Sequence, residues 1–273
     1  MVPNSNVSIA LKDVTIAYRG HPAVHHISGV FEPGSLTALI GPNGAGKSTL
    51  LRVMAKQARL SQGQVHYRGI APHATGTIAY LPQVAGLNPD FALRVIDVVA
   101  MGAWREIGAF GSISTSVMQA LQAALAQVGL ADFESRMVDE LSVGQLQRVL
   151  FARLIVQDAP VILLDEPFNA LDAATVRDLI AIVQDWHQQG RLVVAVLHDM
   201  ATVKNHFPQT LLMARELIAW GPTHDVVKKS LLSEAEHASL AWQDAAPWCY
   251  QPDQPVGAQT HTHIHTQDHH HGH

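Results

Sequence analysis

The chain has 273 residues, of which 48% are hydrophobic, so it is long enough for one large domain, with or without a subdomain, around a sizeable core. A formal net charge of −5 without a basic stripe argues against nucleic acid as the main partner. No uncharged apolar run reaches the roughly 18 residues of a membrane span. The start at Met1 lacks the basic and apolar parts of a signal peptide, so we expect a cytoplasmic protein. Cys249 is alone, which excludes a disulfide framework.

The first part of the chain is predicted to combine a β-rich layer with the beginning of an α/β core. Alternating apolar residues and β-favouring side chains predict strands. Gly63 is expected to open a hairpin through residues 65–67. The predicted strands span residues 7–18, 25–31, 35–40 and 77–81, and the third leads into a helix from about Leu50.

Helical spacing replaces strand patterns between Leu93 and Asp158, which predicts a helical subdomain at about 88–158 inserted into the core. Beyond it, continuous apolar runs predict buried strands on either side of a helix that Asp172 caps and Gly190 ends. A hairpin and short helices to about Trp242 are expected to follow. The predicted helices of the insertion span 93–101, 116–128 and 143–157, the strands 161–165 and 192–197, and the hairpin 211–219.

The composition divides the chain at its C-terminal end. After Asp244 the residues are rich in Pro, Gln, Thr and His, with little apolar spacing. Such a segment cannot bury enough apolar surface to fold, so we expect it to be disordered. We therefore predict a folded domain at 1–243 and a disordered His-rich tail at 244–273.

A glycine-rich loop follows the predicted strand at 35–40 and precedes a predicted helix. This is the context that a phosphate-binding loop requires. Its glycines allow a tight turn that aims successive N–H groups at one spot, where the helix N-terminus favours an anion. Lys47 would reach the β- and γ-phosphates, and the Ser48 hydroxyl would hold Mg²⁺. The loop consists of Gly41, Pro42, Asn43, Gly44, Ala45, Gly46, Lys47, Ser48 and Thr49.

Two adjacent carboxylates end the apolar strand at 161–165. Asp165 would bind Mg²⁺ directly or through water, and Glu166 would polarise the attacking water as a general base. A buried strand that ends in acids is common, but its combination with the glycine loop is typical of ATP hydrolysis.

Six motifs occur in a characteristic order. They are GPNGAGKST at 41–49, Gln83 at a strand end, LSVGQ at 141–145, VILLDE at 161–166, NALD at 169–172, and His198. Over residues 7–230 this order resembles the nucleotide-binding subunit of ABC transporters. The resemblance implies an α/β fold with a P-loop NTPase core, an N-terminal antiparallel β layer and an inserted helical subdomain, and it implies ATP and Mg²⁺ as cofactors.

The resemblance also implies roles for single residues around one ATP. Tyr18 matches the aromatic residue that stacks on adenine. Gln83 matches the Q-loop residue that touches Mg²⁺ and the membrane partner, and His198 matches the switch histidine near the γ-phosphate. Together with Lys47 and Glu166, the last two complete the implied catalytic set.

A second group of residues is implied to act across a homodimer. Ser142, Gly144 and Gln145 match the signature motif, which in this family contacts the ATP bound on the opposite subunit, and Asp172 matches the D-loop acid at the dimer interface. Ser142 precedes a predicted helix, so its hydroxyl and the following N–H groups form a second anion-binding helix start. One chain has one glycine loop and one signature, so two chains would close head to tail around two ATPs.

This chain departs from the family pattern at two positions. Val143 stands where Gly is usual, and a β-branched residue does not easily adopt positive φ. If that backbone conformation matters, we expect weakened but not abolished ATPase activity. The second departure is Asn169, where Ser is more common.

Three segments indicate the cargo by resemblance. Residues 90–102 look like a segment of importers of metal ions and metal chelates, and residues 198–200 and 217–222 are similar to the zinc, manganese and iron branch. The implied function is the ATPase of a metal-ion importer, with zinc first and manganese or iron next. An integral membrane permease would hold it at the cytoplasmic face of the membrane, and an extracytoplasmic metal-binding protein would deliver cargo. The alternatives are a siderophore or haem importer and a soluble ABC ATPase outside transport.

Seven of the seventeen histidines lie in the last thirteen residues. Neutral imidazoles on a flexible chain can bind Zn²⁺, Ni²⁺ or Cu²⁺. We therefore predict a metal-binding tail that buffers or senses cytoplasmic metal, with a purification tag and an idle solvated tail as alternatives. The histidines are His261, His263, His265, His269, His270, His271 and His273.

Overall fold

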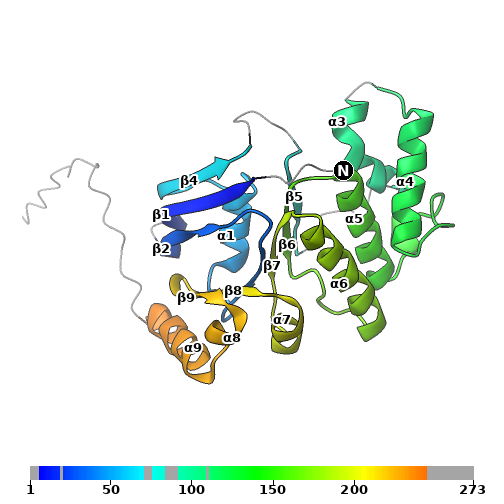
Figure 1. Ribbon diagram of the computed structural model, residues 1–273. Helices are drawn as coiled ribbons and strands as arrows, with labels where there is room; N and C mark the ends of the chain where they lie inside the picture. The colour runs from blue at the N-terminus through cyan, green and yellow to red at the C-terminus, as the bar shows by residue number, and fades with distance from the viewer. Residues whose placement is uncertain (1–5, 19–20, 71–75, 84–91, 109–110, 245–273) are drawn as a thin grey trace, which may run out of the picture.

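The computed structural model describes residues 6–18, 21–70, 76–83, 92–108 and 111–244. Within them, a small antiparallel sheet and a larger, mainly parallel sheet are joined by helices (Figure 1). The predicted α/β class with an antiparallel N-terminal layer is confirmed.

The small sheet has the strand order β2-β1-β4. The predicted hairpin at Gly63 is wrong, because Val65 pairs with Leu11 of β1 and not with a following strand. The second strand also begins earlier than predicted, at His21, where it pairs with Tyr18. The bounds are β1 (Ser8–Tyr18), β2 (His21–Phe31) and β4 (Gln62–Arg68).

The large sheet has the order β5-β6-β7-β3-β8-β9, and its neighbouring strands are parallel except for β8 and β9. The phosphate loop, Glu166 and His198 follow β3, β6 and β7, and Gln83 follows β5. Because parallel strands end at the same edge, these segments meet there, as is usual for ligand sites of α/β sheets. The bounds are β3 (Leu36–Ile40), β5 (Ile78–Leu81), β6 (Val161–Asp165), β7 (Leu192–Val196), β8 (Gln209–Ala214) and β9 (Glu216–Pro222).

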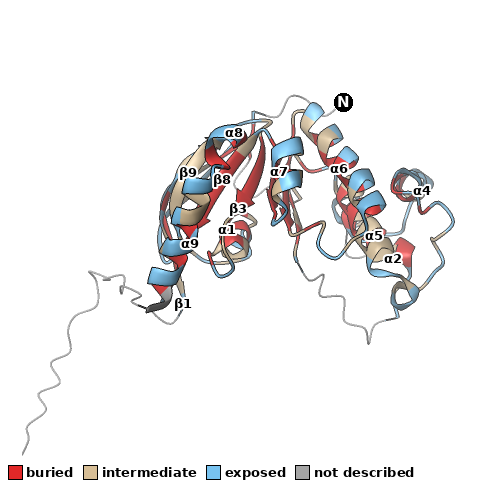
Figure 2. Ribbon diagram, turned by 90° about the horizontal axis from the view of Figure 1, so that it is seen from below, coloured by how far each residue is buried: buried red, intermediate tan, exposed pale blue. Residues whose placement is uncertain are grey.

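Helices cover both faces of the large sheet. Strand residues alternate between the faces, so Ile162 and Leu164 join a core with α2, α4, α5, α6 and α7, whereas Val161 and Leu163 join a core with α1 and the small sheet. Figures 1 and 2 show α1 on one side and α5 and α6 on the other. The bounds are α1 (Lys47–Met54), α2 (Val95–Ala100), α3 (Trp104–Ile107), α4 (Thr115–Gln127), α5 (Val143–Gln157), α6 (Ala173–Gln188), α7 (Met200–His206), α8 (Thr223–Val226) and α9 (Lys229–Asp244).

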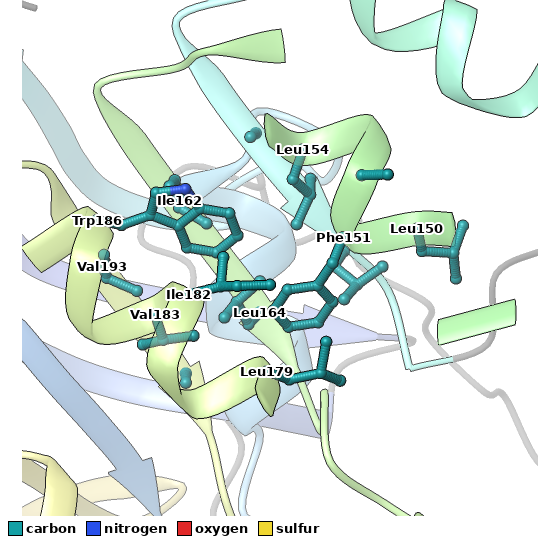
Figure 3. Close-up of a cluster of buried hydrophobic side chains, with 14 of the residues drawn as sticks. Leu150, Phe151, Leu154, Ile162, Leu164, Leu179, Ile182, Val183, Trp186 and Val193 are labelled. Atoms are coloured by element: carbon teal, nitrogen blue, oxygen red, sulfur yellow. The ribbon is translucent and has the colours of Figure 1, made fainter. Parts of the chain in front are cut away.

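The contact between α5 and α6 illustrates how the first core is filled. The rings of Phe151 on α5 and Trp186 on α6 stack with centroids 5.7 Å apart and an interplanar angle of 10° (Figure 3). Both side chains are buried. Truncation of a buried aromatic residue such as Phe151 to Ala typically costs about 3–5 kcal/mol, so this contact fixes the helix that carries the signature motif.

Between β5 and β6 the described residues form helices α2 to α5, two short 3₁₀ helices and a single bridge between Arg94 and Met137. Helix α7 was not predicted, and α9 is longer than the short helices expected there. In the described part of the chain, no helix is long and apolar enough to cross a bilayer. The predicted tail from residue 245 onward lies outside the described residues.

Candidate functional site

The phosphate loop joins β3 to α1, and two of its glycines touch neighbouring backbone. A Cβ on Gly41 would lie 2.0 Å from the carbonyl oxygen of Met213, and a Cβ on Gly46 would lie 2.0 Å from that of Ala23. Gly46 also has a φ of +88° at the N-cap of α1. Larger residues would therefore clash at both positions. The first N–H groups of α1 have no partners within the helix, which makes this turn a site for an anion.

Lys47 folds back over the loop that precedes it. Its ammonium donates to the carbonyl oxygens of Gly41 at 2.8 Å and of Pro42 at 2.9 Å. Burial lowers the pKa of Lys47, while the nearby charges of Glu166 and Asp165 raise it. The ammonium thus carries a positive charge to the centre of the loop, where phosphate oxygens can replace the carbonyl oxygens as acceptors.

Asp165 and Ser48 come together from the ends of β6 and α1. The Ser48 hydroxyl donates to Asp165 Oδ1 at 2.8 Å, and the Tyr80 hydroxyl donates to Oδ2 at 3.4 Å. Burial, helped by the charge of Glu166, raises the pKa of Asp165, and its hydrogen bonds with Ser48 and Tyr80 and the charge of Lys47 oppose this shift. A hydroxyl and a carboxylate oxygen in contact form the hard donor set that Mg²⁺ prefers.

Three side chains donate hydrogen bonds to the carboxylate of Glu166. Gln83 Nε2 lies 2.8 Å from Oε2, His198 Nε2 lies 2.7 Å from Oε1, and Asn169 Nδ2 lies 3.2 Å from Oε2. Glu166 has a φ of +52°, and its N–H donates to the carbonyl oxygen of Val196 at 3.2 Å. The structure thus brings the predicted Gln83, Glu166 and His198 together.

Asn169 is the residue of this group whose contact the sequence did not reveal. In the sequence it was noted as the first residue of the NALD motif and as a position where Ser is more common. The turn that begins at Glu166 returns the amide of Asn169 to the carboxylate, and the backbone N–H of Asn169 donates to the carbonyl oxygen of Glu166 at 3.2 Å. Polar residues shortly after an acidic residue at a strand end are the signal that points to such a contact.

A small cavity of about 160 Å³ lies beside this carboxylate. It is large enough for water molecules, and Glu166, Asn169 and His198 supply polar partners for them. An activated water therefore has room next to Glu166. The other lining residues include Phe168, Val196 and Thr202.

The signature motif forms the start of α5. Ser142 Oγ accepts from Gln145 N at 3.2 Å, and Gln145 Oε1 accepts from Ser142 N at 3.0 Å, which is a capping box. Val143 is the first helical residue and is not among the residues with positive φ. The conformational reason for expecting weakened activity from Val143 is therefore wrong. Its side chain is 65% exposed, and Gly144 lies in the first turn of the same helix.

The phosphate loop and the signature motif are not brought together within one chain. Helix α1 and helix α5 pack on opposite faces of the large sheet (Figure 1). Ser142 N and Oγ are engaged with Gln145 of their own helix, and no hydrogen bond of the described residues joins them to residues 41–49.

The remaining predicted residues lie at separate positions. Asp172 caps α6 by accepting from the backbone N–H groups of Ala174 and Thr175 at 2.9 Å, and hydrogen bonds from Thr175 keep the pKa of Asp172 below its usual range. Tyr18 ends β1 and is 51% exposed. The seven histidines of the tail lie outside the described residues, within which no group of three or more His, Cys, Asp or Glu side chains could hold a metal ion.

Comparison with known proteins matches this arrangement. The family model described as ABC transporter matches residues 24–169. A manganese transport system ATP-binding protein, MntB of Bacillus subtilis, is 36% identical over 80% of this chain and 88% of its own length. A zinc transport system ATP-binding protein, TroB of Treponema pallidum, is 36% identical over 78% of this chain and 81% of its own length.

A solved structure shares the fold. It is an inward-facing ABC transporter assigned to the metal-chelate type, with a TM-score of 0.74 and 28% identity over 85% of this chain and 90% of the matched chain. The family model covers more than half of the chain, and the relatives cover most of it. The loop, the paired acids and the residues around Glu166 thus have a common explanation: the chain belongs to the ABC transporter family and is one of its ATP-binding, ATP-hydrolysing members.

Proposed function

We propose that this protein is the ATPase subunit of an ABC importer for metal ions, with zinc as the favoured cargo and manganese or iron next. It would act at the cytoplasmic face of the membrane, bound to an integral membrane permease that receives metal from an extracytoplasmic binding protein. The observation that carries this proposal is the 36% identity with relatives named for manganese and zinc transport.

ATP would bind with its phosphates in the loop at 41–49. The N–H groups at the start of α1 would face the phosphate oxygens, and Lys47 would exchange its carbonyl acceptors for the β- and γ-phosphates. Tyr18, which is exposed at the end of β1, would stack on the adenine ring.

Ser48, Asp165 and Gln83 would hold Mg²⁺. The contact between the Ser48 hydroxyl and Asp165 at 2.8 Å places two suitable oxygens together, which fits this ion. When bound, Mg²⁺ neutralises charge that develops on the phosphates. Gln83 donates to Glu166 through its amide nitrogen in this structure, and its amide oxygen would be the ligand of the cation.

Glu166 would accept a proton from water as the water oxygen attacks the γ-phosphorus, and the bond from phosphorus to the ADP oxygen would break. The hydrogen bonds from Gln83, Asn169 and His198 fix the orientation of the carboxylate. His198, whose Nε2 lies 2.7 Å from Glu166, would also face the γ-phosphate.

Two chains would close around two ATPs. The signature residues Ser142, Gly144 and Gln145 of one chain would contact the ATP in the loop of the other, with Asp172 near the interface. The support is geometric, because α1 and α5 lie on opposite faces of the sheet, so one chain cannot enclose its own nucleotide with both motifs. ATP binding would close this homodimer and hydrolysis would release it.

The permease would dock in a groove between β5 and the helices that follow it. This groove has a volume of about 520 Å³, and its lining includes Tyr80, Met101, Trp104, Arg105 and Arg153. Trp104 is 61% exposed and Met101 43% exposed, which is unusual for large apolar side chains. An apolar anchor next to arginines suits a short helix of a membrane partner.

Transport by the reconstituted complex tests the proposal. The subunit, its permease and its binding protein would be reconstituted in proteoliposomes, with ATP on the side of the membrane that the ATPase subunit faces. Uptake of ⁶⁵Zn²⁺, Mn²⁺ and iron would then be compared. We expect ATP-dependent zinc uptake that Glu166→Gln abolishes. Uptake of manganese or iron but not zinc would show that the proposed cargo is wrong. Uptake of a metal chelate alone would favour the siderophore or haem alternative, which the similarity to a transporter of the metal-chelate type also suggests.

We further propose that the tail histidines bind cytoplasmic metal and adjust the ATPase rate. The support is compositional, because seven histidines lie within residues 261–273. Zn²⁺ would be titrated into the whole chain and into a chain that ends at Gln259. We expect tighter binding and a zinc-dependent change of ATPase rate in the whole chain alone, whereas equal behaviour of both chains would refute a role for the tail.

A further inference from the structure

The tip of the β8–β9 hairpin lies against the phosphate loop on the side of the loop's backbone. Arg215 is the residue between the two strands, and its N–H donates to the carbonyl oxygen of Ala45 at 3.0 Å. Just before the tip, the carbonyl oxygen of Met213 lies 2.0 Å from the position of a Cβ on Gly41. The hairpin therefore touches the loop at two of its residues, Gly41 and Ala45.

Arg215 also holds the first residues of β2. Its carbonyl oxygen accepts from the N–H of His25 at 2.8 Å, and its guanidinium Nη1 donates to the carbonyl oxygen of Pro22 at 3.2 Å. Between these two contacts lies Ala23, whose carbonyl oxygen would be 2.0 Å from a Cβ on Gly46. The backbone and the side chain of Arg215 thus join the two chain segments that flank the loop.

The conformation of Arg215 is unfavourable for a residue with a side chain. Its φ is +64°, in the left-handed region that glycine occupies without strain and other residues occupy at a cost. Such strain persists where surrounding contacts determine the conformation. The contacts here are the backbone hydrogen bonds with Ala45 and His25 and those of the guanidinium, which donates to Pro22 and lies 5.7 Å from the ring centroid of Trp242.

The buried ring of Trp242 packs beside the guanidinium of Arg215. Its side chain is 8% exposed, and its ring centroid lies 5.1 Å from that of His25. The Nδ1 of His25 in turn lies 2.9 Å from Oε1 of Glu216, the first residue of β9. The C-terminal helix, β2 and the hairpin tip therefore meet at Arg215, which carries these contacts to the phosphate loop through Ala45.

We infer that Arg215 is a positioning residue of the nucleotide site, supported by Trp242. It touches neither the phosphates nor the reacting water. It holds the loop in the shape that receives ATP, so the loop needs less ordering when the nucleotide binds. The first residue of β2 pairs with Tyr18, so the same contacts also fix the strand next to the proposed adenine site. The inference rests on ATP binding, which the family shares, and not on the cargo.

The substitution Arg215→Gly separates the contribution of the side chain from that of the backbone. Glycine relieves the positive φ and keeps the N–H that bonds Ala45, so only the guanidinium contacts are lost. By isothermal titration calorimetry on the whole chain, we expect the Kd for ATP to rise about tenfold, with kcat at saturating ATP changed by less than about twofold. Arg215→Lys keeps the charge but not the fork of the guanidinium, so it should lie between Arg215→Gly and the wild type.

Lys56→Gly is the matched control. Lys56 is also cationic, has a φ of +60° and lies outside the loop, so this variant removes the same charge and relieves the same kind of strain. Its Kd for ATP should equal that of the wild type. Trp242→Ala should raise the Kd as Arg215→Gly does, whereas Trp242→Phe, which keeps a ring beside the guanidinium, should raise it less.

The melting temperature without nucleotide distinguishes positioning from general stability. A purely structural role would lower the melting temperature of Arg215→Gly and leave the ATP affinity of the folded fraction unchanged. Wild-type ATP affinity in both Arg215→Gly and Trp242→Ala would overturn the inference. If Arg215→Gly did not fold, Arg215→Lys and Trp242→Ala would decide in the same assay. If the ATP affinities of the variants changed as expected but the complex did not transport metal, only the proposed cargo would be contradicted.

Discussion

The side-chain amide of Gln147 donates a 2.7 Å hydrogen bond to the carbonyl oxygen of Pro167. Gln147 lies in the second turn of α5, whose first residue follows Ser142, and Pro167 directly follows Glu166. The bond therefore joins the helix that would contact the partner's ATP to the segment that carries Glu166, the proposed general base. We therefore expect a movement of α5 to be transmitted through this bond to the backbone next to Glu166 of the same chain.

Gln147→Leu should lower kcat for ATP hydrolysis severalfold with little change in KM. The substitution keeps the approximate size of the side chain but leaves the carbonyl oxygen of Pro167 without its donor, a loss of about 1–3 kcal/mol for a buried group. Steady-state ATPase assays measure the split. Gln119→Leu, at an exposed position of α4, serves as the control. If KM in Gln147→Leu rose by as large a factor as kcat fell, the proposed coupling would be contradicted.

Glu166→Gln should abolish hydrolysis while ATP still binds. Glutamine preserves the shape of the side chain but cannot accept the proton of the attacking water. With ATP and Mg²⁺, size-exclusion chromatography should show a stabilised dimer. Lys47→Ala should lose nucleotide affinity and remain monomeric, because the cation at the centre of the loop is gone. Hydrolysis by Glu166→Gln at the wild-type rate would contradict the assignment of the base.

The sequence was sufficient for the order of the core elements because their signals are local. Helix α5 begins and ends at the predicted residues, since Ser142 forms a capping box with Gln145 at its start. Helix α7 was not predicted because it has only seven residues, and only one of them, Val203, is buried. Its actual signal is Asp199, which accepts from the N–H groups of Ala201 and Thr202.

Long-range pairing was the weaker part of the prediction. The turn at Gly63 suggested a hairpin, whereas β4 pairs with β1, about fifty residues earlier in the chain. A strand does not reveal in its own residues which edge it will join. The same limit applies to the site: the family resemblance implied Gln83 and His198, and the pair of acids at a strand end predicted Glu166, but the contacts of Asn169 and Arg215 depend on where distant turns meet.

Val143→Gly should leave the ATPase rate within about twofold of the wild type, since the first position of a helix does not require the special conformations of glycine. Val143 already adopts helical geometry there, with its side chain 65% exposed. The melting temperature should fall slightly, because glycine in a helix costs up to about 1 kcal/mol. A clear increase in ATPase rate for Val143→Gly would restore the view that valine slows the closure of the dimer.

Asp165→Asn should stabilise the nucleotide-free chain at neutral pH and abolish Mg²⁺-dependent hydrolysis. Burial raises the pKa of Asp165 above its ordinary value of 3.8, so ionisation costs more in the folded chain than in the unfolded chain. This carboxyl group therefore reduces folding stability as the pH rises from 3.8 through the raised folded pKa. Melting temperatures measured from pH 7 downward should show the advantage of Asp165→Asn shrinking toward acid. An advantage that grows toward acid would contradict this sign.

Trp104→Ala should prevent assembly with the permease. The side chain is 61% exposed at the edge of the groove that also contains Met101 and Arg105, and aromatic anchors of this kind carry much of the binding energy of an interface. Copurification of the tagged permease with the variant measures the effect. Leu240→Ala, which removes another exposed apolar side chain from α9, is the control and should assemble normally. A fully assembled complex of Trp104→Ala with an unchanged transport rate would place the permease on a different surface of the chain.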